Sequence, residues 1–85
     1  MKSRIDKLEY KLKINNNKYY YKNDERHRDK DLPAVVWEDG YRVWYKNGLR
    51  HRDNGKASEI YSDGRMFWYK NGKFIKSNYN EIENK

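Results

Sequence analysis

The chain is 85 residues long, enough for one small domain, and its formal net charge is +7. It has no cysteine, which excludes disulfides and thiolate zinc sites, and no apolar run near the roughly 20 residues of a membrane-spanning helix. Aromatic residues make up 16% of the chain, although hydrophobic residues reach only 35%. Disordered chains are poor in aromatic residues, so we expect a folded domain whose apolar area comes from large rings.

The first expected element is a β-strand over residues 8–14 (LEYKLKI), where apolar and charged residues alternate strictly. The asparagines at 15–17 then turn the chain into a second strand over residues 18–22. A helix is the alternative to the first strand, and it would place on one face the residues Ile5, Leu8 and Leu12.

From residue 20 onward the chain repeats itself at an interval of 24 residues. The phrase WYKNG occurs at 44–48 and 68–72, a degenerate YYKND stands at 20–24, and His-Arg-Asp occurs at 27–29 and 51–53. Self-similarity at a fixed period of this size is typical of repeat architectures. The copies align with one slip, because HRDKDLPA in the first copy is a residue longer than HRDNGKA in the second.

Each repeat carries two hairpin signals. Asn-Gly and Asp-Gly are the strongest signals for a two-residue turn, because both central residues of a type I′ turn need positive φ. We therefore predict two-residue turns at Asn47-Gly48, Asn71-Gly72, Asp39-Gly40 and Asp63-Gly64. The predicted cross-strand pairs are Trp44 with His51, Val36 with Val43 and Trp37 with Arg42. The fold class is then all-β, an antiparallel meander of β-hairpins with about 24 residues per repeat.

That register gives the sheet two apolar faces. The first, suited to a closed core, would carry Ala34, Val36, Val43, Tyr45, Ile60, Phe67 and Tyr69. The second would be richer in Trp and Tyr and would also carry Val35 and His51. A thin sheet cannot bury both faces by itself, and an open apolar patch normally indicates a binding surface. The alternative is that all the rings form the core. The predicted partner-binding residues are Trp37, Arg42, Trp44, Tyr61, Met66 and Trp68.

The positive charge is concentrated at the start of the chain. Residues 1–22 carry seven Lys and Arg against two acidic residues, whereas residues 23–69 carry nine of each. A basic segment can contact phosphates, and the tyrosines at 19–21 could stack on bases. The alternative is a solvated lysine excess that reflects only compositional bias. The candidate nucleic-acid contacts are Lys7, Lys11, Lys13, Lys18 and Lys22.

The repeated His-Arg-Asp is the most chemically suggestive triplet. Protein kinases carry the same three residues, but no other part of that signature is present. We expect His27 and His51 to pack on the rings while Asp29 and Asp53 cap turns. No metal site or cofactor is expected, and no enzymatic activity, because the sequence contains no recognisable nucleophile or acid–base motif.

The pattern W-Y-x-N-G-x-x-H-R-x-x-G-x-A, followed by a strand and Asp-Gly, resembles that of the MORN-repeat-variant family. That family includes antitoxin-like bacterial members, and a similar W-Y-x-N-G…H-R-x-D-G-P-A repeat occurs in proteins of phages and large viruses. The resemblance covers residues 18–74, and residues 44–57 match best, with Lys56 where the pattern prefers Pro. It implies a meander of MORN-like repeats without catalytic residues, which binds proteins or, in some members, membranes.

We expect a single β-repeat domain over residues 1–76, followed by a C-terminal tail over 77–85. Its parts are the N-terminal strand at 8–14, repeats at 18–42 and 43–65, and a partial repeat at 66–76. The expected function is a protein-interaction module of a phage or mobile element that binds and inhibits a host factor, such as a toxin or defence effector. The alternatives are a nucleic-acid-binding accessory protein that uses the basic N-terminal strand and, more remotely, an adaptor for anionic membranes. No signal-peptide pattern is visible, so the expected location is the cytoplasm of the host cell, and the open face could also pair two copies of the chain.

Overall fold

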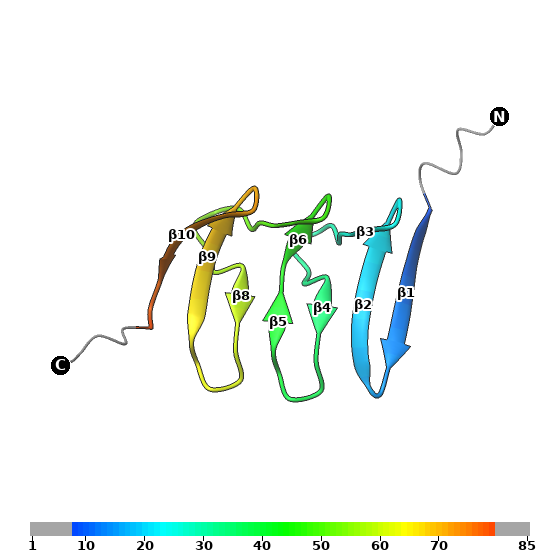
Figure 1. The fold of residues 1–85 in the computed structure, drawn as a ribbon, viewed down its shortest axis with the longest axis horizontal. Coiled ribbons are helices and arrows are strands. Elements are labelled where there is room, and N and C mark those ends of the chain that lie inside the picture. The colour runs from blue at the N-terminus through cyan, green and yellow to red at the C-terminus, as the bar shows by residue number, and fades with distance from the viewer. Residues whose placement is uncertain (1–7, 80–85) are drawn as a thin grey trace.

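The computed structural model describes residues 8–79, which form strands and turns and contain no helix. The strands lie side by side in one row, with β1 and β10 at its two ends (Figure 1). They are β1 (Glu9–Ile14), β2 (Asn17–Lys22), β3 (Glu25–Arg26), β4 (Val35–Val36), β5 (Arg42–Val43), β6 (Tyr45–Lys46), β7 (Leu49–Arg50), β8 (Glu59–Ile60), β9 (Met66–Lys70) and β10 (Lys73–Ser77). The main sheet has the order β1-β2-β4-β5-β8-β9-β10, β3 pairs with β2, and β6 and β7 form a separate hairpin. Every pairing is antiparallel, so the all-β prediction is confirmed.

The N-terminal hairpin joins β1 to β2. Ile14 pairs with Asn17, and the two residues between them, Asn15 and Asn16, have φ values of 51° and 70°. Asparagine tolerates this left-handed region better than most residues, which explains why a turn without glycine forms here. The predicted strand is therefore present, and the helical alternative is wrong.

The Asn-Gly turns have the predicted two-residue geometry. Asn47 and Gly48 have φ values of 51° and 83°, and Asn71 and Gly72 have the same values. Lys46 consequently pairs with Leu49. The predicted neighbours Trp44 and His51 are also confirmed, because the amide of His51 donates to the carbonyl of Trp44 at 3.0 Å.

The Asp-Gly turns differ from the prediction. Trp37 N donates to Tyr41 O at 2.8 Å and Gly40 N donates to Trp37 O at 3.0 Å. Only Gly40 has positive φ, at 102°, while Asp39 does not. The loop is thus three residues long, a type I turn followed by a bulged glycine. The Asp39 carboxylate stabilises it by accepting from the amide of Tyr41 at 2.9 Å, and the Asp63-Gly64 turn has the same backbone bonds at the equivalent residues.

The extra loop residue shifts the register by one. Val35, not Val36, pairs with Val43, and Arg42 pairs with Val36, not with Trp37. Because side chains alternate along a strand, a shift of one residue moves a whole strand to the other face. The predicted division of residues between the faces is therefore wrong for the strands at 34–37 and 60–61.

The register defines two faces. We call the first the aromatic face, and it carries Tyr19, Val35, Val43, Glu59 and Phe67 across β2, β4, β5, β8 and β9. We call the second the loop face, and it carries Lys18, Val36, Arg42, Ile60 and Met66 on the same strands.

The loop face takes its name from the two His-Arg-Asp segments, which fold back over it. The indole Nε1 of Trp44 donates to Asp31 O, and that of Trp68 donates to Gly55 O, both at 3.0 Å. Trp44 is only 6% exposed under its loop. The buried residues are Ala34, Val35, Val43, Trp44 and Ala57, together with the polar His27, His51, Ser58 and Glu59.

The backbone keeps one spacing between the two loops. Tyr20 N donates to Ala34 O, and Trp44 N donates to Ser58 O. Positive φ values occur at Lys30 and Asp31 and again 24 residues later, at Asn54 and Gly55. The predicted slip of one residue in this segment is therefore wrong, since Ala34 is equivalent to Ser58 and not to Ala57.

Candidate binding surfaces

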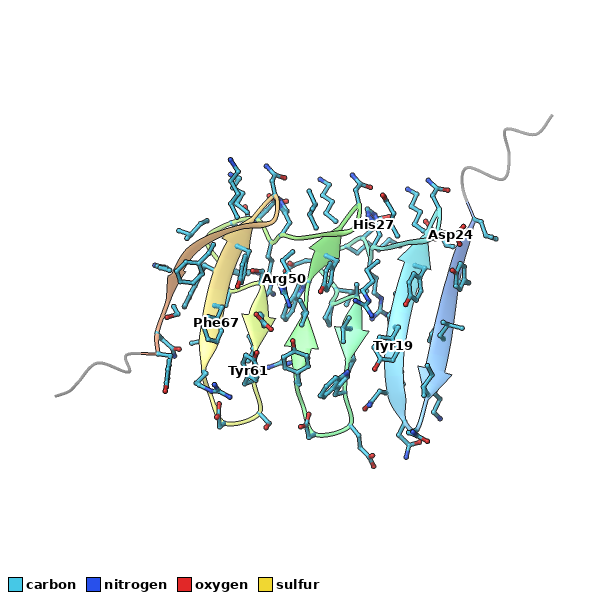
Figure 2. All side chains as sticks on the ribbon, in the orientation of Figure 1. Tyr19, Asp24, His27, Arg50, Tyr61 and Phe67 are labelled. Carbon is cyan, nitrogen blue, oxygen red and sulfur yellow. The ribbon has the colours of Figure 1, made fainter. Side chains whose placement is uncertain are left out.

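Four rings pack edge to edge across the Asp-Gly end of the aromatic face. Trp37 and Tyr41 have centroids 4.8 Å apart, as have Tyr41 and Tyr61, and Tyr61 lies 5.6 Å from Phe67. Figure 2 shows Tyr61 and Phe67 on the side of the sheet turned to the viewer. Trp37 is 40% exposed although it belongs to this row. The three-residue turns hold these rings, because they pair Trp37 with Tyr41 across the loop.

A buried carboxylate lies beside the four rings. Glu59 is 4% exposed, and its Oε2 accepts from the hydroxyl of Tyr41 at 2.5 Å. Burial and this hydrogen bond raise the pKa of Tyr41 well above its ordinary value. Arg50 Nε lies 3.7 Å from Glu59 Oε1, too far for a hydrogen bond, and it has no other partner among residues 8–79. Arg50 therefore faces the carboxylate without being fully engaged by it.

Arginines alternate with rings toward the Asn-Gly end of the same face. Arg26 lies 5.6 Å from the ring centroid of Tyr19 and 5.7 Å from that of Tyr45. Arg50 lies 5.8 Å from the ring of Tyr45 and 5.3 Å from that of Tyr69. These separations are within the range of cation–π attraction. The result is a row of rings and guanidinium groups across the sheet, and Figure 2 labels Tyr19 and Arg50 within it.

The six predicted partner-binding residues do not share a face. Trp37 and Tyr61 lie on the aromatic face. Arg42 and Met66 lie on the loop face, each paired with a residue of β4 or β8. Trp44 and Trp68 also lie on the loop face, where the loop carbonyls hold their indoles. The structure therefore brings together only the first pair, and the partner-binding role of all six stays a prediction.

Sequence reasoning missed the arginines of the aromatic face and placed Tyr45 and Tyr69 in a closed core. A signal for the arginines was present, because an Arg precedes each His of the two His-Arg-Asp triplets, at Arg26 and Arg50. In a two-residue hairpin the position before the histidine lies directly opposite the tyrosine, as Arg50 does opposite Tyr45.

The basic residues of the N-terminal hairpin gather on the loop face. Lys13 pairs with Lys18, Lys11 pairs with Tyr20, and Lys22 pairs with Glu9. Alternation places all four of these lysines on the same side as Tyr20. Lys22 Nζ lies 4.0 Å from Glu9 Oε2. Lys7, the fifth predicted nucleic-acid contact, lies outside the described residues.

Each histidine of the two triplets ties its loop to the next Asn-Gly turn. The Nδ1 atom of His27 accepts from the amide of Asn47 at 2.9 Å, and its Nε2 lies 2.8 Å from Asp29 Oδ1. Because Nδ1 accepts, the ring proton is on Nε2, which donates to Asp29. This hydrogen bond holds the pKa of Asp29 below its usual range. His51 repeats the arrangement with Asn71 and Asp53. The aspartates therefore orient the histidines instead of capping turns as predicted.

No metal cluster accompanies these histidines. Among residues 8–79, no group of three His, Cys, Asp or Glu side chains could hold a metal ion. Nor is any helix within this range long and apolar enough to cross a membrane.

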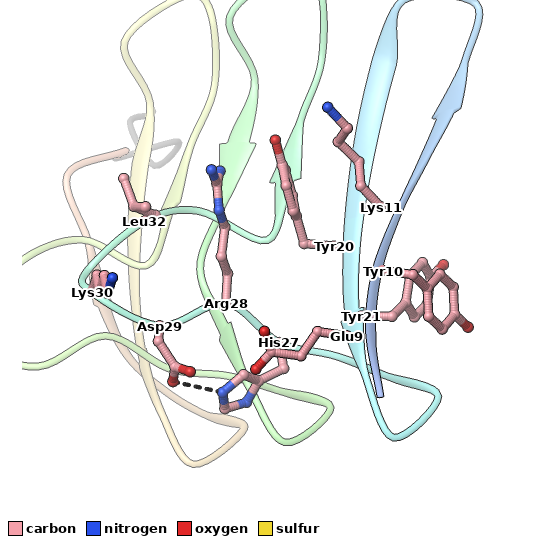
Figure 3. A pocket seen from close by; sticks show the side chains of 10 residues that line it. All are labelled: Glu9, Tyr10, Lys11, Tyr20, Tyr21, His27, Arg28, Asp29, Lys30 and Leu32. Atoms are coloured by element: carbon pink, nitrogen blue, oxygen red, sulfur yellow. Dashed lines mark hydrogen bonds and ion pairs between the residues drawn. The ribbon is translucent and has the colours of Figure 1, made fainter. Parts of the chain in front are cut away.

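Two clefts flank the first His-Arg-Asp loop. The larger, of about 380 Å³, lies between this loop and the β1–β2 hairpin (Figure 3). Its lining includes Lys11, Tyr20, Arg28, Lys30 and Leu32. The smaller, of about 120 Å³, lies between the two loops, and its lining includes Asp31, Trp44 and Arg52.

Comparison with known proteins leaves the chain without a relative. A scan against protein-family models, a search of curated proteins and a search of solved structures each give no match.

Proposed function

We propose that this protein is a non-enzymatic protein-interaction module and that its aromatic face carries the interface. The observation on which this rests is the row of rings and arginines on a single-layered sheet whose covering loops both pack on the opposite face. Trp, Tyr and Arg are the residues that dominate the binding energy of protein interfaces. An apolar surface of this kind on a small domain typically marks a contact site.

The packing of the row favours binding by a preformed surface. Its rings contact one another and the arginines in fixed orientations, so little side-chain entropy remains to be lost when a partner binds. The exposed Trp37 and Phe74, at 40% and 57%, offer apolar anchors near two ends of the face. Arg26 and Arg50 add charge that can pair with an acidic partner while their planes stack on the tyrosines.

We further propose that the partner is a host toxin or defence effector, bound and inhibited by a phage or mobile-element protein. This part of the proposal is supported by the resemblance of the repeat to MORN-repeat-variant proteins and by nothing else.

The test is an affinity pull-down from the native host with matched variants of the two faces. Arg26 and Arg42 are both exposed, but they lie on opposite faces. We expect wild type and Arg42→Ala to retain the same partner, and Arg26→Ala and Trp37→Ala to lose it while their melting temperatures stay close to that of the wild type. Equal capture by Arg26→Ala and Arg42→Ala, with and without nuclease treatment, would count against the aromatic face.

Nucleic-acid binding is the second candidate, and the cluster of four lysines on the loop face beside Tyr20 favours it. A protein that neutralises several phosphates loses affinity steeply as salt rises, with a log–log slope of roughly −0.7 to −0.9 per contact. We expect oligonucleotide binding to be weak, independent of sequence and lost at moderate salt. Tight binding that resists salt in a fluorescence-anisotropy titration would reverse the ranking of the two functions.

A further inference from the structure

The two loops hold their arginines in the same way on their inner side. The guanidinium carbon of Arg28 lies 3.7 Å from the ring centroid of Tyr20, and that of Arg52 lies 3.7 Å from the ring of Trp44. The Nη1 of Arg28 donates to Pro33 O at 3.2 Å, and the Nη1 of Arg52 donates to Ala57 O at 3.0 Å. Each guanidinium is thus stacked on a ring and anchored through one of its nitrogens.

The outer side of Arg52 holds a carboxylate. Asp31 of the preceding loop accepts from Arg52 Nε at 2.9 Å and from Nη2 at 3.2 Å, which is a two-pronged pairing. Lys56 Nζ adds a third contact to the same carboxylate at 3.2 Å. Arg52 and Lys56 lower the pKa of Asp31 to about 2.

The outer side of Arg28 has no such carboxylate among residues 8–79. The contact that the structure gives its guanidinium nitrogens is the one to Pro33 O. The space beside it is the cleft of about 380 Å³, whereas the equivalent space beside Arg52, occupied by the preceding loop, is reduced to about 120 Å³. The residue 24 positions before Asp31 is Lys7, which carries the opposite charge. Figure 3 shows Arg28, Tyr20 and Lys11 extending side by side along this cleft.

We propose that the Arg28 cleft is a carboxylate-binding site that takes an Asp or Glu side chain from an acidic segment of a partner protein. The carboxylate binds Arg28 through Nε and Nη2, as Asp31 binds Arg52, and Lys11 or Lys30 takes the part of Lys56. The guanidinium is already stacked and anchored, so the fork is oriented before the ligand arrives. The site lies on the loop face, so it is separate from the aromatic face and goes beyond the function proposed for that face.

A carboxylate fits the cleft better than the phosphates of a nucleic acid. The molecule already binds a carboxylate in the equivalent place, with a planar two-pronged geometry. Glu9 also lines the cleft, and beyond the hairpin the repeats carry no excess positive charge along which a phosphate backbone could continue. A short acidic segment needs only the local charge of Arg28, Lys11 and Lys30.

The probe is a capped peptide with the sequence of residues 28–33 (RDKDLP), which carries the Asp31 carboxylate in the sequence that docks on Arg52. The control peptide carries Asp31→Asn. We expect the full-length protein to bind the first peptide in an NMR titration that follows the Arg side-chain Nε–H signals, with the Arg28 signal among those that shift. Loss of a charge-assisted, two-pronged bond should weaken the control peptide by about 10-fold or more.

Two protein variants make the test specific. Arg28→Lys keeps the charge but loses the planar fork, so it should weaken the acidic peptide by about 10-fold. Arg26→Lys makes the same substitution on the aromatic face and should leave binding unchanged. Circular dichroism melts verify that both variants are folded.

Several results would overturn the proposal. These are absence of wild-type binding at millimolar peptide, equal affinity of Arg28→Lys, or displacement of the peptide by an oligonucleotide of equal charge at lower concentration. A large gain in affinity on Asp6→Asn would show that a carboxylate of the same chain fills the cleft, and it too would exclude a partner site. Failure of the Arg26 and Trp37 pull-down leaves this result untouched, so the two proposals fail separately.

Discussion

The first and second His-Arg-Asp loops are alike on the side that faces the sheet and different on the side that faces away from the preceding strands. Their histidines and arginines have the same partners at almost the same distances. The second loop, however, packs against the first through Asp31, while the first borders an open cleft. The inner contacts belong to the repeat itself, whereas the outer contacts depend on a neighbour. In stacked repeats, each unit completes its packing only against the next, so the first loop presents a surface that the second has already satisfied.

The largest expected effect separates the two rings under the arginines. Trp44 is buried at 6% exposure between its loop and the sheet, and Trp44→Ala should destabilise the protein by roughly 3–5 kcal/mol. Tyr20 is only half-buried, with a cleft beside it, so Tyr20→Ala should cost roughly 1–2 kcal/mol, since less of the ring is removed from water. Urea unfolding of both variants measures the difference. Equal losses would show that the first slot is as closed as the second.

The next prediction tests whether the inner sides are equivalent. His27→Ala and His51→Ala each leave a turn amide, that of Asn47 or Asn71, without its acceptor. The loss of a buried hydrogen bond together with the packing of a ring should cost roughly 1–3 kcal/mol in each case. Because the partners are the same, we expect the two free-energy changes to agree within about 0.5 kcal/mol. A much larger loss for one histidine would mean that the loops are not equivalent even where their contacts coincide.

Much of the fold could be predicted because its signals are local. The alternation at residues 8–14 and the Asn-Gly turns predict strands and register that the structure confirms. Asp-Gly failed because the same dipeptide also suits a type I turn with a bulged glycine, in which Asp39 keeps negative φ and its carboxylate caps the next amide. A dipeptide does not distinguish these turns, and the single extra residue reversed the faces of two strands.

The candidate surfaces were harder to predict, since they depend on contacts between repeats. Charge and ring content predicted that binding residues exist, but Trp44 and Trp37 are the same residue type with opposite burial. Only the loop that folds over Trp44 separates them. An unbroken 24-residue comparison would have found one buried position, because Glu59 is equivalent to the core residue Val35. The Asp31–Arg52 pairing had no signal in the sequence, since Gly55 occupies the Asp31 position in the next copy.

A smaller effect concerns the carboxylate that fills the second slot. Arg52 and Lys56 hold the pKa of Asp31 at about 2, below the roughly 3.9 of an unfolded chain. A lowered pKa means that the pairing stabilises the folded state above about pH 4 and that this contribution is lost as the pH falls through 2. We expect the melting temperature of Asp31→Asn to lie below that of the wild type at pH 7 and to converge with it near pH 2. A gap that persists at pH 2 would assign the effect to shape instead of charge.

The smallest expected effect comes from building the missing pairing into the last repeat. Lys76 stands 24 residues after Arg52 and covers the ring of Trp68 at 4.9 Å, as Arg52 covers Trp44. The Asp31 position is there occupied by Gly55, whose φ is 71° and which has open space around an added Cβ. Gly55→Asp and Gly55→Asn should carry similar backbone strain, because both side chains tolerate the left-handed region. Their difference therefore isolates the carboxylate. An exposed ion pair contributes roughly 0.2–1 kcal/mol, so Gly55→Asp should be the more stable of the two by a few tenths of a kcal/mol in low salt. In about 1 M NaCl, where the Debye length is roughly 3 Å, the difference should disappear. If the aspartate variant is no more stable in low salt, then the pairing at Arg52 depends on the planar guanidinium and not on charge alone, and the Arg28 cleft would be correspondingly selective for a ligand that matches its fork.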